Sequence, residues 1–221
     1  QIPTFETGSV IASRYRVLAI LGKGGMGAVY KTHDRELDRV VALKVIRPEL
    51  AASTDITQRF KQEIILAREI THRNIVRMYD LGQFDETKFV TMEFVEGETL
   101  AQSLKRRGRF PAGDAVAVMR QVCDGLAAAH GRHIVHRDLK PANIMIGDYG
   151  ETVVLDWGLA RKLADEVGAD AMSPLADHAD AGDSGNNMTA CGAVLGTPLY
   201  MAPEQAAGKR DEIGERSDVY A

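Results

Sequence analysis

The sequence contains little cysteine and no long apolar run. Cys123 and Cys191 are the two cysteines in 221 residues, which excludes a disulfide-rich scaffold and favours a reducing compartment. No apolar run approaches the roughly 18 residues of a membrane-spanning helix, and the first residues lack a signal-peptide pattern. We therefore expect a cytoplasmic chain without a membrane segment.

Aromatic residues and an excess of one charge are also scarce. Lys and Arg number 27 against 31 Asp and Glu, and the resulting net charge of -4 argues against a nucleic-acid partner. Aromatic residues make up 6% of the chain, so the core must be mainly aliphatic. A chain of this length forms one or two domains and buries roughly 70% of its unfolded surface without a disulfide or metal.

Strand patterns dominate the first part of the chain and helical patterns the second. We expect strands over 15–21, 28–32, 39–46, 75–81 and 88–95, with a polar turn over 34–38 and a helix over 54–70. Beyond Gly97, one apolar stripe predicts a buried helix over 112–130, and short strands follow at 144–146 and 152–155; the stripe consists of Val116, Met119, Cys123, Leu126 and His130. Residues 163–189 contain no Lys or Arg and are expected to be mobile. The pattern predicts two lobes joined near residues 93–97.

A glycine-rich motif lies between the first two of these strands. Gly22, Gly24, Gly27 and Val29 fit G-x-G-x-x-G-x-V. A dinucleotide-binding fingerprint would need a helix after the glycines, whereas a strand follows here. The context favours a hairpin over nucleotide phosphates, where the missing Cβ atoms let backbone N–H groups approach oxygen. An ordinary flexible hairpin fits the motif equally well by itself.

A lysine and a glutamate occupy apolar surroundings. Lys44 shares one face of its expected strand with Ala42, and an ammonium on that face must meet anions. Glu63 falls in the middle of the apolar stripe of the helix expected over 54–70, so it calls for a cationic partner. We expect Glu63 to pair with Lys44; the alternative is a Glu63 that borders the core and reaches water.

The segment with the most potential catalytic groups runs from His136 to Asn143, and Asp156-Trp157-Gly158 follows it. It is a loop between a helix and a strand, and loops on rigid scaffolds are common places for catalytic groups. Within it, Asp138 could accept a proton from a hydroxyl group. Asn143 and Asp156 offer the oxygen ligands that Mg²⁺ prefers.

These motifs together resemble the eukaryotic-type (Hanks-type) protein kinases, and among them the bacterial serine/threonine protein kinases. The resemblance spans residues 15–221 and includes Gly24–Gly27 and the segment Met201-Ala-Pro-Glu-Gln205. It implies an α+β, bilobal protein-kinase-like fold with an N-terminal extension (1–13), a β-rich N-lobe with one main helix (14–95) and a mainly helical C-lobe (96–221). This C-lobe would hold a long activation loop (159–201) and would be truncated, ending at the start of the large anchoring helix.

The resemblance also implies a nucleotide site for ATP. Gly22, Gly24 and Gly27 would cover the phosphates, and Lys44, oriented by Glu63, would hold the α- and β-phosphates. The adenine-binding residues implied in this way are Val29, Ala42 and Met145 around the ring, Met92 at the gatekeeper position, and the backbone of Glu93 and Val95.

The same resemblance implies the chemistry and the partners. Asp138 would orient and deprotonate the substrate hydroxyl, Lys140 would neutralise the transferred phosphoryl group, and Asn143 and Asp156 would carry Mg²⁺, with Mn²⁺ as an alternative. The expected partners are proteins phosphorylated on Ser or Thr, and a second kinase copy for trans-autophosphorylation. A segment beyond residue 221 could anchor the parent protein to a membrane.

Regulatory positions follow from the resemblance as well. Arg137 would pair with a phosphorylated activation loop, because a phosphate suits a bidentate arginine. Thr189 is the expected autophosphorylation site, ahead of Ser173 and Ser184, and Thr197 marks the serine/threonine branch. Asp218 would brace the backbone around His136 and Arg137.

Two departures leave other functions open. The family's Asp-Phe-Gly triplet reads Asp156-Trp157-Gly158, and the larger indole carries an N–H group that needs a partner. The second departure is the end of the sequence. The resemblance implies that Glu204 pairs with an arginine, and that arginine would lie beyond residue 221. The alternatives to an active protein kinase are therefore a non-catalytic nucleotide-binding scaffold, an inactive kinase fragment and a small-molecule kinase of related fold.

Overall fold

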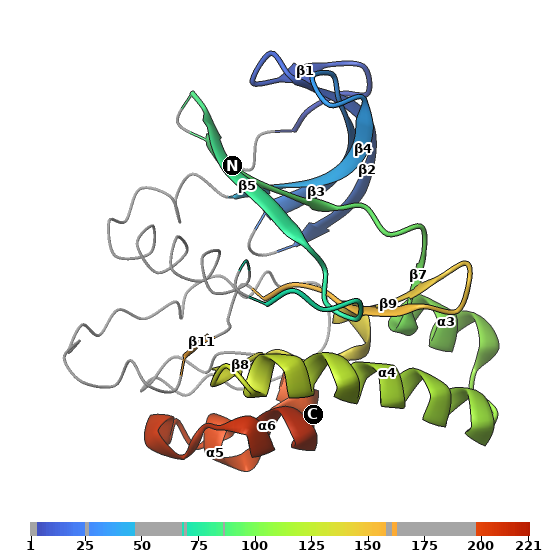
Figure 1. Ribbon diagram of the computed structural model, residues 1–221, viewed down its shortest axis with the longest axis vertical. Helices are drawn as coiled ribbons and strands as arrows, with labels where there is room; N and C mark the ends of the chain where they lie inside the picture. The colour runs from blue at the N-terminus through green and yellow to red at the C-terminus, as the bar shows by residue number, and fades with distance from the viewer. Residues whose placement is uncertain are drawn as a thin grey trace, which may run out of the picture.

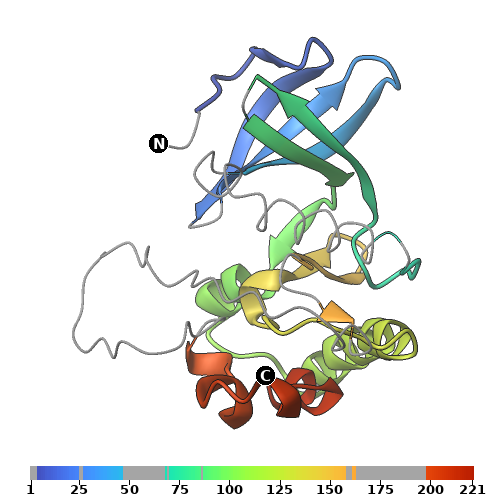
Figure 2. The same ribbon diagram turned by 90° about the vertical axis from the view of Figure 1, so that its left-hand side faces the viewer.

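The structure is a computed structural model that describes residues 4–24, 27–46, 68, 70–85, 87–157, 161–162 and 198–221. Within these ranges, a strand-rich lobe and a mainly helical lobe are stacked end to end (Figures 1 and 2). The first described residues lie in the strand-rich lobe and the last lie in the helical lobe. No helix among the described residues is both long and apolar enough to cross a membrane.

An antiparallel sheet forms the first lobe. In the described part of the chain it has six strands in the order β1-β2-β3-β4-β6-β5. The strands are β1 (Val10–Ile11), β2 (Tyr15–Gly24), β3 (Gly27–Asp34), β4 (Arg39–Ile46), β5 (Met78–Phe84) and β6 (Thr87–Glu93). The strand predicted over 39–46 has the observed bounds. The strand predicted over 75–81 is wrong by three residues at each end, because residues 72–76 turn away to contact the other lobe.

Alternation along these strands separates a core face from a cleft face. One face carries a closely packed aliphatic and aromatic cluster that includes Val17, Tyr30, Val41, Leu43 and Phe89. Because side chains alternate along a strand, Ala42 and Lys44 emerge on the opposite face. That face is directed toward the second lobe, since Met92 on β6, the register partner of Ala42, packs against the core of the helical lobe.

The N-terminal residues belong to the sheet more closely than an extension over 1–13 implies. Val10 and Ile11 form β1 and pair with Arg16 and Tyr15, and Ile11 is fully buried. Phe5 packs edge-on against Tyr30, with ring centroids 5.8 Å apart. The polar turn after β3 is built as the sequence indicates, because Asp34 Oδ1 accepts hydrogen bonds from the backbone N–H groups of residues 36 and 37.

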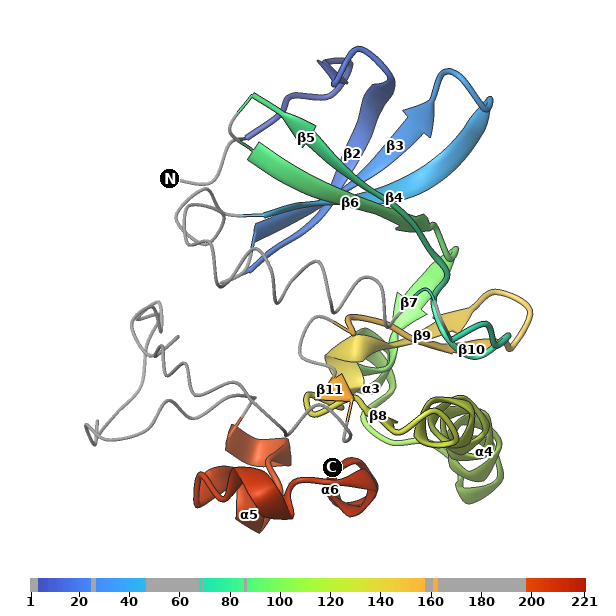
Figure 3. The same cartoon turned by 60° about the vertical axis from the view of Figure 1, so that its left-hand side comes forward.

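The second lobe begins directly after the connecting segment at residues 94–96 (Figure 3). Its regular elements are β7 (Gly97–Thr99), α3 (Leu100–Arg107), α4 (Ala112–His130), β8 (Ile134–Val135), η1 (Pro141–Asn143), β9 (Ile144–Gly147), β10 (Thr152–Val154), β11 (Arg161–Lys162), η2 (Pro198–Tyr200), α5 (Pro203–Ala206), η3 (Arg210–Glu212) and α6 (Glu215–Tyr220). Strands β10, β9 and β7 make a small antiparallel sheet that lies between the first lobe and α4.

Helix α4 has the predicted bounds, but of its predicted buried stripe Leu126 is buried while Val116, Met119 and Cys123 are exposed. Val116 is 58% exposed and Met119 45% exposed, whereas Val122, Leu126 and Ala129 are buried. Both faces of the helix are apolar, so periodicity alone does not decide between them. The decisive residue is Gly125, where an added Cβ would lie 3.0 Å from the Asn74 carbonyl oxygen. The absence of a side chain lets α4 approach residues 74–75 on this face.

Helix α3 was not predicted, although its sequence carries a capping signal. Thr99 Oγ1 accepts a hydrogen bond from the Gln102 N–H at 3.2 Å, and Gln102 Oε1 accepts one from the Thr99 N–H at 2.8 Å. Thr-x-x-Gln before an apolar residue is a capping box, which marks a helix start. The helix predicted over 54–70 and the loop predicted over 163–189 lie outside the described residues, apart from residues 68 and 70.

Candidate active site

The cleft face of the first sheet gathers most of the predicted nucleotide-binding residues by register alone. Gly22 lies opposite Val29, and Val29 lies opposite Lys44. Ala42 lies opposite Met92 on the next strand. Since residues paired across antiparallel strands project to the same face, these side chains share one surface. Ala42 is 7% exposed, and Lys44 keeps 14% of its side chain accessible.

Glycine is required at the end of the hairpin. Gly27 has a φ of 149°, and a Cβ added there would lie 1.8 Å from the Val45 carbonyl oxygen. Any side chain at this position would therefore collide with backbone of the neighbouring strand. Gly24 pairs with Gly27, so β2 and β3 remain paired up to the last described residue on each side of the turn.

Lys44 reaches across to the second lobe. Its Nζ donates a hydrogen bond to Asp156 Oδ1 at 2.6 Å. Burial acts to raise the pKa of Asp156, but the charge of the Lys44 ammonium group and its hydrogen bond outweigh burial, and the pKa lies below its usual value. The carboxylate is therefore charged at neutral pH. Glu63, the partner predicted for Lys44, lies outside the described residues.

Two predicted catalytic-loop residues converge on one carboxylate oxygen of a third, Asp138. Asp138 Oδ2 accepts a hydrogen bond from Lys140 Nζ at 2.8 Å and one from Asn143 Nδ2 at 3.2 Å. Asn143 Nδ2 also donates to the Asp138 carbonyl oxygen at 2.8 Å. Asn143 is 7% exposed, whereas the Asp138 and Lys140 side chains remain 12% and 23% accessible. The group thus combines a fixed carboxylate, a cation and access from solvent.

Asp218 on α6 braces this loop, as predicted. Its two oxygens accept hydrogen bonds from the backbone N–H groups of His136 and Arg137, both at 2.8 Å. His130 Nε2 lies 2.9 Å from Asp218 Oδ2 as a third polar contact. Arg137 has a φ of 69°, a left-handed conformation that costs free energy in a non-glycine residue. The buried carboxylate therefore stabilises a strained turn immediately before Asp138.

A second brace was missed by the sequence interpretation. Gln205 on α5 donates from Nε2 to the Arg137 carbonyl oxygen at 2.9 Å and accepts from the Ala202 N–H at 3.1 Å. Both backbone polar groups of Arg137 are thus held, one by Asp218 and one by Gln205. The available signal was a glutamine directly after Ala-Pro-Glu, but nothing in the sequence indicated which carbonyl it would bind.

Backbone hydrogen bonds bring the loop that carries Asn143 beside the segment that carries Asp156. The Leu155 N–H donates to the Asn143 carbonyl oxygen at 2.8 Å, and His136 Nε2 contacts the Leu155 carbonyl oxygen at 2.9 Å. Because the amide nitrogen of Asn143 is bound to Asp138, its amide oxygen is directed away from Asp138. An amide oxygen and a charged carboxylate on adjacent segments are hard oxygen donors that fit Mg²⁺ or a similar divalent cation.

The comparisons with known proteins agree with this geometry. A family model described as the protein kinase domain matches residues 15–221. The chain belongs to the protein kinase family. Its curated relatives include serine/threonine-protein kinase pkn3 of Myxococcus xanthus, 38% identical over 219 residues that cover 97% of this chain and 37% of that protein. PrkC of Bacillus subtilis is 36% identical over 214 residues, which cover 97% of this chain and 30% of that protein.

Solved kinase structures share the fold. The kinase domain of PknI from Mycobacterium tuberculosis matches with a TM-score of 0.69 and 27% identity, over 97% of this chain and 71% of that chain. The present chain spans about a third of the length of the curated kinases that it matches. The predicted relationship to bacterial serine/threonine kinases and the predicted bilobal kinase fold are confirmed.

The remaining predicted adenine-binding positions lie at the end of β6, in the connecting segment and on β9. Met92, Val95 and Met145 are partly buried and pack against the core of the helical lobe. The Glu93 N–H donates to the Arg77 carbonyl oxygen at 2.9 Å. Lys31 on β3 also contacts this segment, with its Nζ 4.2 Å from the centre of the Phe94 ring and 3.6 Å from a Glu96 carboxylate oxygen.

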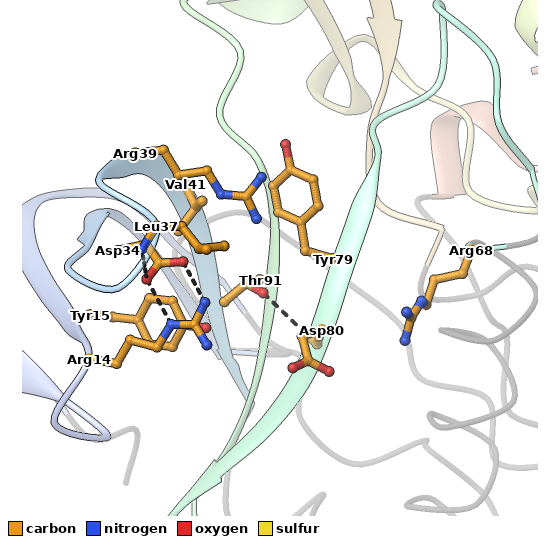
Figure 4. A pocket seen from close by; sticks show the side chains of 10 residues that line it. All are labelled: Arg14, Tyr15, Asp34, Leu37, Arg39, Val41, Arg68, Tyr79, Asp80 and Thr91. Atoms are coloured by element: carbon orange, nitrogen blue, oxygen red, sulfur yellow. Dashed lines mark hydrogen bonds and ion pairs between the residues drawn. The ribbon is translucent and has the colours of Figure 1, made fainter.

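A pocket of about 260 Å³ lies on the other face of the sheet and is not part of the kinase site (Figure 4). In it, Arg14 donates to both oxygens of Asp34 at 2.7 Å, and the Arg39 guanidinium lies 4.0 Å from the centre of the Tyr79 ring. The hydrogen bond from Arg14 holds the pKa of Asp34 below its usual value. Val41 lines this pocket, and its strand neighbour Ala42 projects to the cleft face, so the sheet separates the two sites.

The predicted regulatory positions are only partly described. Arg137 is placed as above, whereas Thr189, Thr197, Ser173 and Ser184 lie outside the described residues. Glu204 accepts a hydrogen bond from Ser217 Oγ on α6, a contact that the sequence interpretation did not foresee. This bond lowers the pKa of Glu204 and joins α5 to the helix that carries Asp218.

Proposed function

We propose that this chain transfers the γ-phosphate of ATP to serine and threonine hydroxyl groups of proteins. The observation that carries the proposal is the convergence of Lys140 and Asn143 on Asp138, next to the segment where Lys44 meets Asp156. Phosphoryl transfer needs positioned charges more than covalent chemistry from the protein. The site offers a base, a cation beside it and a second carboxylate for a metal ion.

In this proposal the nucleotide lies between the lobes. Gly22, Gly24 and Gly27 cover the phosphates, and Lys44 holds them by exchanging part of its contact with Asp156 for phosphate oxygens. Glu63 then orients Lys44. The adenine ring packs against Val29, Ala42 and Met145, with Met92 at the back of the pocket.

Hydrogen bonds to the adenine edge come from the connecting segment. The Glu93 N–H is already committed to the Arg77 carbonyl oxygen. The donor to adenine therefore falls to the backbone of Val95, and Glu93 contributes through its carbonyl group. The position of Lys31 against Phe94 and Glu96 supports a fixed geometry for this segment.

Asn143 and Asp156 hold Mg²⁺, with Mn²⁺ as the alternative ion. When bound, the ion neutralises charge on the phosphate oxygens and orients the nucleotide. The residues of this chain do the rest. Asp138 orients the substrate hydroxyl group and accepts its proton, while Lys140 neutralises negative charge next to Asp138.

Transfer to protein substrates can be tested with ATP labelled at the γ-phosphate and a generic protein substrate. We expect label on serine and threonine with wild type, and a loss of about a hundredfold or more in Asp138→Asn, because the proton acceptor is removed. Asp148→Asn, at an exposed turn position, is the matched control and should retain activity. Equal labelling by wild type and Asp138→Asn would refute the proposed mechanism.

Regulation of the proposed kinase involves the activation loop. We infer that Thr189 is autophosphorylated and that Arg137 binds the phosphate, since two contacts already fix the Arg137 backbone. Thr197 lies at the proposed substrate platform. Mass spectrometry after incubation with ATP and Mg²⁺ should find phosphate on Thr189; phosphate at other positions but never there would exclude this site.

We further propose that two copies associate for trans-autophosphorylation in the cytoplasm, where ATP is available. Mixing wild type with a Lys44→Met variant, which cannot orient ATP, distinguishes transfer between two copies from transfer within one copy. Phosphate on the variant chain is expected for transfer between copies. Phosphate confined to wild-type chains at every concentration would show transfer within one copy.

A further inference from the structure

Trp157 is the residue at which this chain departs from the triplet of the family it resembles, and the structure gives its indole N–H a specific partner. Trp157 Nε1 donates to the Val154 carbonyl oxygen at 3.3 Å, and the residue is 2% exposed. Its ring meets the His136 ring edge-on, with centroids 4.7 Å apart. A phenylalanine at this position would fill part of the same space but has no donor.

The acceptor of this bond belongs to a rigid part of the protein. Val154 is fully buried in β10, and its N–H donates to the Asn74 carbonyl oxygen at 2.8 Å. Its own carbonyl oxygen also accepts the Val76 N–H at 3.0 Å. Gln121 on α4 holds the start of β10 by accepting the Thr152 N–H at 3.0 Å. The indole is therefore fastened to a strand that both α4 and residues 74–76 fix in place.

Between this strand and Trp157 the backbone makes an unfavourable turn. Asp156 has a φ of 55°, in the left-handed region that costs free energy in a residue with a side chain. The preceding residue is held on both sides, because the Leu155 N–H donates to Asn143 and its carbonyl oxygen contacts His136. The hydrogen bond from Trp157 to Val154 closes this turn on the C-terminal side of Asp156. The turn directs the Asp156 carboxylate toward Lys44.

We propose that the indole N–H of Trp157 is a latch that positions Asp156 beside Lys44, an inference that rests on the proposed phosphate transfer. Trp157 acts through Asp156 and is a positioning residue rather than a catalytic one. The latch holds the strained turn before the nucleotide arrives, so the charged carboxylate is in place for a metal–nucleotide complex. Losing the donor alone lets the turn relax and weakens nucleotide binding without removing any group that contacts the nucleotide.

The latch can be observed directly, because Trp157 is the one tryptophan in the sequence. Tryptophan emission, excited selectively over that of the tyrosines, therefore reports a single ring. We expect the blue-shifted emission of a buried indole and strong protection from acrylamide quenching in the nucleotide-free chain. Lys44→Met should leave both unchanged, since the latch does not depend on the ion pair. Emission typical of an exposed indole in wild type would overturn the proposal.

The hydrogen bond can be separated from ring volume by replacing Trp157 with 3-benzothienylalanine, in which sulfur substitutes for the N–H group at nearly constant shape. Binding of Mg·ATP should weaken about threefold to tenfold, the equivalent of one hydrogen bond. In the Asp156→Asn background the same replacement should have no further effect, because the latch acts on affinity through the Asp156 carboxylate. Trp157→Phe should behave like the benzothienyl variant, with an added loss of thermal stability from the smaller ring.

A merely structural role predicts a different pattern. If the benzothienyl variant loses thermal stability but binds Mg·ATP like wild type, the latch does not position Asp156 and the proposal is wrong. Equal losses of affinity in the wild-type and Asp156→Asn backgrounds would also overturn it. Fluorescence and nucleotide affinity do not require turnover, so a chain that binds Mg·ATP through the latch but transfers no phosphate would refute the proposed function alone.

Discussion

Asp218 offers a sharp test of how the catalytic loop is held. It is 2% exposed and accepts backbone hydrogen bonds from His136 and Arg137 at 2.8 Å, with His130 Nε2 2.9 Å from one of its oxygens. In Asp218→Asn one carboxylate oxygen becomes an NH₂ group. Whichever way the amide turns, that NH₂ group faces at least one backbone N–H, and a buried donor loses its acceptor.

The expected loss in the free energy of unfolding of Asp218→Asn follows from these contacts. A hydrogen bond to a charged group contributes about 1.5–3 kcal/mol, and an unsatisfied buried donor costs about 1–3 kcal/mol. Together with the weaker remaining bonds, we expect Asp218→Asn to lower the free energy of unfolding by about 3–5 kcal/mol, comparable to breaking a buried ion pair. Against a typical total of about 5–15 kcal/mol, that loss leaves the helical lobe only marginally stable.

Urea denaturation followed by circular dichroism measures this change, and the rate of phosphate transfer should fall with it because Arg137 relaxes from its φ of 69°. Asp211→Asn, an exposed aspartate in η3, is the matched control and should change stability by less than about 0.5 kcal/mol. A loss below about 1 kcal/mol in Asp218→Asn would refute the idea that this carboxylate stabilises the strained loop.

Three further outcomes are expected. Asp34→Asn should cost about 2 kcal/mol at neutral pH, since it removes a buried carboxylate that is paired with the partly exposed Arg14. Because the folded-state pKa of Asp34 is lowered, the difference from wild type in urea unfolding should shrink as pH falls below about 4. A difference independent of pH would contradict the pairing. Gly27→Ala should cost at least about 2 kcal/mol in thermal unfolding, because its Cβ would lie 1.8 Å from the Val45 carbonyl oxygen; a neutral result would mean that the hairpin adopts another conformation. Lys31→Met removes the cation–π contact of the connecting segment, so the protein should lose about 1 kcal/mol of stability. The KM for ATP should rise while kcat stays unchanged. An unchanged KM would show that this contact does not affect nucleotide binding.

Local pattern was sufficient for much of the fold. Alternation along residues 39–46 gave the bounds of β4, and the face that carries Ala42 and Lys44 follows from alternation alone. The polar turn after Asp34 is local as well, because the aspartate binds backbone groups two and three residues ahead. These features depend on neighbours in the sequence, which is why they could be predicted.

Features that depend on distant segments were predicted less well. The buried face of α4 is selected by close approach of Gly125 to Asn74, a contact between parts of the chain far apart in the sequence. The bond of Gln205 to the Arg137 carbonyl oxygen and the partner of the Trp157 indole are of the same kind. The brace by Asp218 was predicted through family resemblance, since spacing alone does not bring residues 136 and 218 together.

The central claim is that Asp138 carries out phosphate transfer in a cleft whose nucleotide site is built by other residues. It is tested most directly by measuring Mg·ATP affinity and phosphate transfer to a protein substrate on the same preparations of wild type and Asp138→Asn. Affinity should change by less than about twofold, while transfer should fall by about a hundredfold or more, since a positioned base contributes about 10²–10⁴ to the rate. Equal transfer by wild type and variant, or a wild type that binds Mg·ATP and transfers nothing, would contradict this role of Asp138.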